Sequence, residues 1–150
     1  MAEDDAGELP KVRARSQARH RALDVLYQAD LLEQPIPTVL ARELNEPSGP
    51  RPDVYTIELV SGVDRLREEL DRRIDAAAER WTIDRMPLVD RNLLRLAAFE
   101  LIERSDVPTA VVLDEAIELA KLLSTEGSGR FVNGVLGRIA RDVRPSGGSA

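Results

Sequence analysis

Residues 93–102, which read LLRLAAFELI, decide the fold of this chain. Arg95 and Glu100 are the only charged residues in this stretch, and apolar side chains fill the rest of the helical circumference. A helix that is apolar on all sides belongs in the centre of a helical bundle. Its two charges would then be buried, and a buried charge needs a partner. We therefore predict a central helix in which Arg95 forms an ion pair with Glu115 or Asp114 of the following helix.

The prolines indicate how the rest of the chain is divided. Proline has no amide hydrogen to donate and clashes with the preceding helical turn, so it marks helix boundaries or first turns. The stretches between the prolines are rich in Ala, Leu, Arg and Glu, which favour helices. Ser61-Gly62 lies inside one such stretch and marks either a bend or a close-packing point. The sequence predicts an all-α fold with helices near residues 16–33, 38–44, 53–80, 89–103, 108–124 and 130–143.

Composition limits the class of protein. The chain has 150 residues, of which 43% are hydrophobic and 32% charged, as expected for one globular domain. No apolar run approaches the roughly 20 residues that cross a bilayer, and the acidic N-terminus is unlike a secretory signal. The absence of cysteine excludes disulfides and thiolate metal sites. We expect a cytoplasmic protein with a flexible acidic tail at 1–11, a helical domain at 12–143 and a disordered tail at 144–150.

The net charge of −6 hides a basic block near the N-terminus. The block contains no acid, and its members are Lys11, Arg13, Arg15, Arg19, His20 and Arg21. A compact basic block on an acidic body is typical of a surface that binds a phosphate backbone. The alternative is a solvated helix start or a disordered tail. The charge pattern alone leaves both interpretations open.

Residues 127–134, GSGRFVNG, form a second candidate site before the last predicted helix. The start of a helix has backbone N–H groups without helical partners, and these favour phosphate. Phe131 offers a ring on which an unpaired base can stack, and Asn133 an amide that can read its edge. The alternative is an ordinary helix start with Phe131 in the core and Gly134 permitting close packing. The residues alone do not exclude either interpretation.

Catalytic patterns are missing from the sequence. There is no phosphate-binding GxxxxGK[ST] loop, no GxGxxG and no HExxH. His20, the single histidine, lies among arginines. Asp114, Glu115 and Glu118 share one helix, whereas a carboxylate pair that does acid–base work faces across a cleft. We expect no enzymatic activity, no cofactor and no metal.

Four motifs, taken in order, closely resemble the NusB family. They are LRLAAFEL at 94–101, DVP at 106–108, DEAIELAK at 114–121 and FVNGVL at 131–136. Further residues fit the same pattern at the front and middle of the chain: Arg15, Ala18, Arg19, Ala22, Leu26, Tyr27, Trp81, Asp90 and Arg91. The resemblance covers nearly the whole domain, and the combination is far more specific than any one motif.

The resemblance implies a compact all-α fold of about seven helices and a role in transcription antitermination. Members of the family bind the boxA element of ribosomal RNA leaders together with NusE, a ribosomal small-subunit protein. They then join NusA, NusG and RNA polymerase. Carried onto this chain, the resemblance implies RNA contacts by Arg13, Arg15, Arg19, Ser128, Arg130, Phe131 and Asn133. Arg85 and Arg104 are the candidates for contact with NusE.

Some features of the sequence depart from the family or leave a choice open. Gly127 stands where relatives often carry an acid, which removes a polar contact from the RNA site. A NusB-like domain also precedes some ribosomal RNA methyltransferases, but this chain has no cysteine nucleophile. The alternative function is a protein adaptor for NusE with incidental RNA contact. The sequence also leaves open whether the chain forms a homodimer.

RNA binding requires the front arginines and the turn before the last helix to converge as one cationic platform.

Overall fold

A computed structural model describes the backbone of residues 2–145 and the side chains of residues 11–145. Within this part of the chain all regular structure is helical, which confirms the predicted fold class. The helices are α1 (Ala2–Leu31), α2 (Ile36–Leu44), α3 (Val54–Ala78), the 3-10 helix η1 (Ile83–Arg85), α4 (Leu88–Glu103), α5 (Thr109–Leu123) and α6 (Ser128–Val143). None of the described helices is long and apolar enough to cross a membrane.

The predicted tails lie mostly outside the described part of the chain. At the C-terminus this applies to residues 146–150, and at the N-terminus to the side chains of residues 1–10. The backbone of α1 is helical from Ala2, well before the predicted start of the first helix.

Prolines set several helix starts, as the sequence predicted. Pro35, Pro87 and Pro108 each precede the first residue of a helix, at α2, α4 and α5. The ring of proline suits this position because the first residues of a helix do not donate helical hydrogen bonds. At the start of α3 the side chain of Asp53 accepts a hydrogen bond from the backbone N–H of Tyr55 at 2.7 Å, a standard N-cap.

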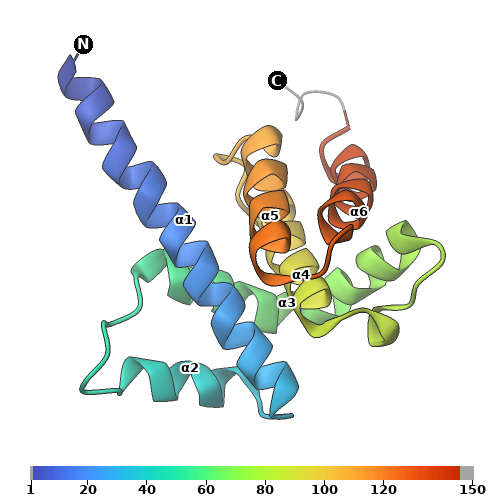
Figure 1. The fold of residues 1–150 in the computed structure, drawn as a ribbon, viewed down its shortest axis with the longest axis horizontal. Helices are drawn as coiled ribbons and strands as arrows, with labels where there is room; N and C mark the ends of the chain where they lie inside the picture. The colour runs from blue at the N-terminus through green and yellow to red at the C-terminus, as the bar shows by residue number, and fades with distance from the viewer. Residues whose placement is uncertain (1, 146–150) are drawn as a thin grey trace.

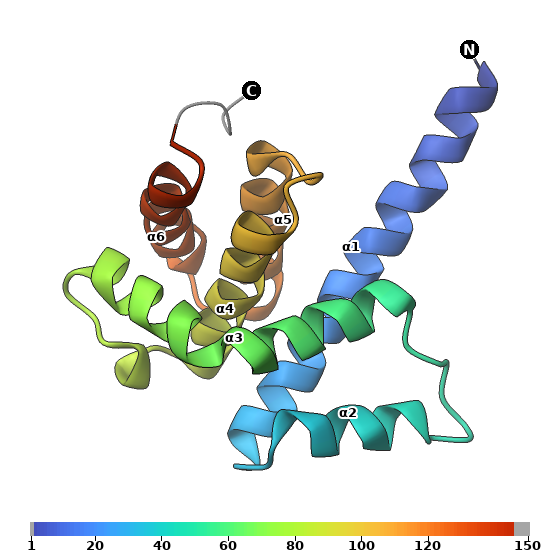
Figure 2. The same cartoon turned by 180° about the vertical axis from the view of Figure 1, so that it is seen from behind.

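Helix α4 is the centre of the bundle. It contacts α1, α3, α5 and α6, and its residues 92–101 are all buried. Figures 1 and 2 show α4 between α3 and the pair formed by α5 and α6. Helix α2 lies at one edge, against α1 and α3. The prediction of a central helix from its apolar circumference is therefore confirmed.

Gly62 is a close-packing point and not a bend. Helix α3 runs without interruption past Gly62, and a Cβ atom at this position would lie only 2.1 Å from the ring of Phe99 on α4. No side chain fits in that space. Glycine at position 62 therefore lets the backbone of α3 pack directly against the ring of Phe99 on α4.

The predicted partner of Arg95 is wrong. Arg95 is buried, with an exposed fraction of 3%. Its Nε lies 2.8 Å from Oδ1 of Asp71 on α3, and its Nη1 lies 3.4 Å from Oδ2 of Asp30 on α1. Glu115 pairs instead with Arg19. Arg95 thus projects from α4 towards α1 and α3 and not towards α5, a direction that the sequence of α4 alone does not reveal.

Asp30 is the acceptor at the centre of this ion-pair network. Burial would raise the pKa of Asp30, but hydrogen bonds from Arg91 and Asn92 outweigh it and lower the pKa to about 2. Because the folded pKa lies below the usual value of 3.8, Asp30 stabilises the protein at neutral pH. This contribution is lost as the pH falls from about 4 towards 2.

We expect Asp30→Asn to lower the free energy of unfolding at pH 7 by about 1 kcal/mol, after allowance for solvent screening. The melting temperature of the variant should also depend less on pH between about 4 and 2. Thermal unfolding followed by circular dichroism across this range measures both effects. Asp24→Asn, at an exposed position of the same helix, is the control. An equal acid sensitivity of wild type and Asp30→Asn would contradict the prediction.

Arg144, placed in the disordered tail by the sequence, belongs to the folded domain. Directly after α6, its guanidinium donates hydrogen bonds of 2.7–3.2 Å to several acceptors around the end of α4. The acceptors are the backbone carbonyls of Glu100, Leu101, Arg104 and Val107 and the hydroxyl of Thr109. The last carbonyls of a helix have no partner within the helix. Arg144, which follows the last helix in the sequence, therefore caps the C-terminus of α4.

Candidate nucleic-acid interface

The N-terminal half of α1 extends away from the other helices (Figures 1 and 2). We call residues 2–14 the arm. Within the arm, Lys11 and Arg13 are exposed. Arg13, His20 and Tyr27 are seven residues apart, which is about two helical turns, so their side chains lie on one face of α1. This face, which we call the strip, runs from Arg13 on the arm to Tyr27 on the body of the molecule.

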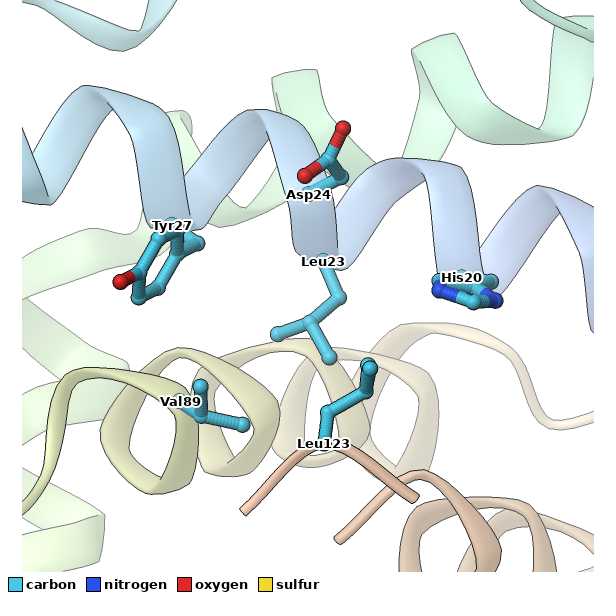
Figure 3. A pocket seen from close by; sticks show the side chains of 6 residues that line it. All are labelled: His20, Leu23, Asp24, Tyr27, Val89 and Leu123. Carbon is cyan, nitrogen blue, oxygen red and sulfur yellow. The ribbon is translucent and has the colours of Figure 1, made fainter.

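A pocket of about 250 Å³ lies where this face of α1 meets α4 and α5. Figure 3 shows Leu23 pointing towards Leu123 of α5, with the rings of His20 and Tyr27 on either side. Val89 of α4 completes the apolar floor, and Asp24 adds one acidic residue to the lining. An open pocket with aromatic rings beside an apolar floor suits an unpaired base, which gains stability by stacking.

The sequence prediction missed this pocket. It cited Tyr27 only as part of the family pattern and His20 only as lying among arginines. His20 is exposed, and Leu123 at the end of α5 is 40% exposed. The spacing of seven between Arg13, His20 and Tyr27 is the signal that could have revealed the strip.

The side chain of Arg19 points from α1 into the interior of the protein and is not on the surface. Its exposed fraction is 3%. Its Nε and Nη2 donate to the carboxylate of Glu100 at 2.8 and 3.0 Å, and its Nη1 donates to Glu115 at 3.1 Å. Burial opposes the charge of Arg19, but the hydrogen bond and charge of Glu100 outweigh it and raise its pKa. The guanidinium of Arg19 is therefore enclosed and occupied by carboxylates, which does not favour the predicted contact with RNA.

Arg15 and Arg104 lie around the ring of Tyr55. The guanidinium carbon of Arg15 is 4.6 Å from the ring centroid, and that of Arg104 is 5.0 Å away. Arg104 also donates to Glu58 at 2.5 Å and to Asp106 at 3.0 Å. Arg15 is part-exposed, and its longer ion pair with Asp106 measures 3.4 Å. Arg15 is therefore the more accessible of the two cations, whereas Arg104 is held in ion pairs.

The turn between α5 and α6 is fixed to α4 by hydroxyl groups. Ser128 is buried, and its hydroxyl donates to Asp90 at 3.1 Å. The hydroxyl of Ser124 also donates to Asp90, and that of Thr125 lies 2.9 Å from the hydroxyl of Ser128. The hydroxyl of Ser128 therefore holds the turn in place, which does not favour the predicted contact with RNA. Next to it, Gly127 has a φ of 93°, in the left-handed region that glycine adopts most readily.

The first turns of α6 carry the exposed part of the second predicted site. Arg130 and Asn133 are exposed, in a position to meet a ligand. Phe131 is partly buried and packs against the core, yet it also lines a pocket of about 320 Å³ together with Trp81, which is 50% exposed. Phe131 thus packs against the core as one interpretation predicted, while stacking of an RNA base on its ring stays a prediction. Arg85, the other candidate for a protein contact, is exposed in η1.

The two predicted basic regions do not form one compact platform. Arg15 contacts Asp106, just before the start of α5, whereas the turn at 124–127 follows the end of α5. Helix α5 has 15 residues and so separates them by about 22 Å. The basic block therefore extends along α5: Arg15 lies near its start, whereas His20 shares a pocket with Leu123 at its end. Only the His20 end of the block approaches the turn, and Arg15 does not converge with it as predicted.

Comparison with known proteins identifies the family. The model of the NusB family matches residues 16–141 of this chain. The transcription antitermination protein NusB of Saccharopolyspora erythraea is 53% identical over 128 residues, which cover 85% of this chain and 86% of the relative. The chain belongs to the NusB family. The relative's name agrees with the expectation of a non-enzymatic antitermination factor.

Solved NusB structures have the same fold. NusB of T. maritima is 35% identical, with a TM-score of 0.77 over 85% of this chain and 91% of that one. A crystal structure of the antitermination factors NusB and NusE in complex with double-stranded RNA contains a chain that is 33% identical. Its TM-score is 0.75, over 87% of this chain and 98% of that one. The predicted NusB-like bundle is thereby confirmed, with six α-helices and one 3-10 helix in residues 2–145.

Proposed function

We propose that this chain acts in transcription antitermination by binding the boxA RNA of ribosomal RNA leaders together with NusE. The observation that carries the proposal is the strip on α1, which leads from the exposed Arg13 to the pocket of His20 and Tyr27. The strip combines a cation for phosphates with rings for bases, the two components of single-strand recognition. The related complex of NusB, NusE and double-stranded RNA supports the same pair of partners.

NusE should strengthen RNA binding. The chain has a net charge of −6, so its body repels RNA and only local groups of exposed cations attract it. A second protein that adds RNA contacts would raise the affinity, and the same coupling would raise the affinity for NusE. We place its contact near the exposed Arg85 and Trp81. The pair would then join NusA, NusG and RNA polymerase in the cytoplasm, and a homodimer through the strip would compete with RNA.

Titration of a boxA RNA with and without NusE, in a gel-shift assay at about 50 and 200 mM salt, tests this function. We expect weak binding by the chain alone, stronger binding with NusE, and a steep loss of affinity at the higher salt. The adaptor function would be favoured if the chain never shifted the RNA band, with or without NusE, and if RNA did not change the affinity of the chain for NusE.

Tyr27→Ala in the same assay tests the pocket. Loss of one stacked base should weaken RNA binding about tenfold, because stacking of a base on an aromatic ring contributes about 1–3 kcal/mol. Tyr27→Phe keeps the ring and should bind like wild type. Equal affinities of wild type and Tyr27→Ala would remove the pocket from the RNA path.

A further inference from the structure

Contacts at the base of the arm determine the direction in which it projects. The hydroxyl of Ser16 donates a hydrogen bond to Oε1 of Glu115 on α5. Nη1 of Arg19 donates to the same oxygen at 3.1 Å. Ser16 and Arg19 are three residues apart on α1, and one carboxylate oxygen therefore holds two neighbouring turns of the helix.

The same region of α1 is also held from α3 and α4. The ring of Tyr55 lies beside the guanidinium groups of Arg15 and Arg19, at 4.6 and 5.7 Å from the ring centroid. The hydroxyl of Tyr55 donates to Glu100 at 2.5 Å. Burial and this hydrogen bond raise the pKa of Tyr55, so the phenol stays protonated. The core of this cluster, Arg19 with Glu100 and Tyr55, does not depend on Glu115.

The arm acts as a lever on this base. Its 13 residues span about 20 Å at 1.5 Å per residue, so a tilt of about 20° moves its tip by about 7 Å. Lys11 and Arg13 are exposed on the arm. His20 and Tyr27 lie on the same continuous helix, so a tilt of α1 moves the arm relative to α3 and α5 and to the Val89 and Leu123 side of the pocket. A shift of a few ångströms would place the charges of the arm out of step with the phosphates of a bound strand.

We propose that Glu115 is a positioning residue for RNA binding, which fixes the direction of the arm without touching RNA. This inference rests on the proposed function. It makes a prediction opposite to that of simple electrostatics. Glu115 is an acid beside the basic strip, with 22% of its side chain exposed. If its charge alone mattered, its removal would strengthen RNA binding. If it positions the arm, its removal weakens RNA binding.

The test compares Glu115→Gln with Glu118→Gln in the boxA gel-shift assay. Both variants remove one negative charge from α5, but Glu118 is exposed and lies one turn further along the helix. We expect Glu115→Gln to bind RNA about 5- to 10-fold more weakly than wild type. Glu118→Gln should bind as tightly as wild type or more tightly. Circular dichroism should show folded protein for both, because the contacts of Arg19 with Glu100 remain.

A second measurement follows the arm directly and needs no RNA. The chain contains no cysteine, so spin labels at Val12→Cys and Arg72→Cys report a single distance between the arm and α3. Both positions are exposed. Electron–electron resonance should give a narrow distance distribution for the labelled chain and for Glu118→Gln. The distribution should be broadened or shifted in Glu115→Gln.

An affinity of Glu115→Gln equal to or above that of wild type would overturn the inference, and so would an unchanged distance distribution. A wild-type chain that fails to bind boxA RNA with NusE would overturn the proposed function instead. The distance measurement would then still decide whether Glu115 anchors the arm. The two failures are therefore distinguishable.

Discussion

Arg19→Leu is expected to lower the free energy of unfolding by about 3–5 kcal/mol, the usual effect of removing one member of a buried ion pair. Glu100 has an exposed fraction of 1%. Without Arg19 its carboxylate would keep the hydroxyl of Tyr55 as a donor but would have lost its opposing charge. An uncompensated carboxylate in the core is strongly unfavourable. Urea denaturation at pH 7 measures the loss.

Two controls separate the buried charge from the loss of one arginine. Arg21→Leu removes a neighbouring arginine whose ion pair with Glu43 is partly exposed, and it should change stability by about 1 kcal/mol or less. Arg19→Leu combined with Glu100→Gln removes both charges and should recover part of the lost stability. If Arg19→Leu alone were as stable as wild type, the pair of Arg19 and Glu100 would not be what holds the core together.

The double variant Lys11→Ala/Arg13→Ala is expected to weaken boxA binding by about tenfold and to reduce the dependence of affinity on salt. Each phosphate contact of a single strand contributes about 0.7 to the slope of log affinity against log salt, so the loss of two contacts should reduce that slope by about 1.4. Both side chains are exposed, and the fold should not change. Fluorescence anisotropy of labelled RNA across a salt series measures both quantities.

The matched control is Arg42→Ala/Arg72→Ala, which removes the same charge from exposed positions of α2 and α3. Its affinity should lie within about twofold of wild type, because surface charges further than a Debye length are screened. If both double variants lost affinity equally, RNA would respond to the net charge of the protein and not to the cations of the arm.

The fold could be predicted because its main signals are local. Proline marks a helix boundary whatever surrounds it, and the apolar circumference of residues 93–102 indicates burial on all sides. At Gly62 the sequence left a bend and a close-packing point open, and only the structure showed that the ring of Phe99 fills the space. In each case the property lies within a few residues of the chain.

The partners of polar side chains could not be predicted in this way. The carboxylate of Glu100 that binds Arg19 lies 81 positions further along the chain, and the carboxylate of Asp90 that binds Ser128 lies 38 positions before it. Which polar residue becomes buried depends on which helices meet, and a single helical pattern does not contain this information. The exposed candidates Arg13, Arg130 and Asn133 were placed correctly on the surface, while their contact with RNA stays a prediction.

The cap provided by Arg144 has a consequence for the order in which the protein folds on the ribosome. The backbone carbonyls that it binds lie 37–44 positions before it. As synthesis proceeds from the N-terminus, the central helix emerges while the end of that helix still lacks its donors. Native closure of this end must wait until the final turn of the domain has left the exit tunnel, so nascent chains halted before that point should remain open to proteolysis there.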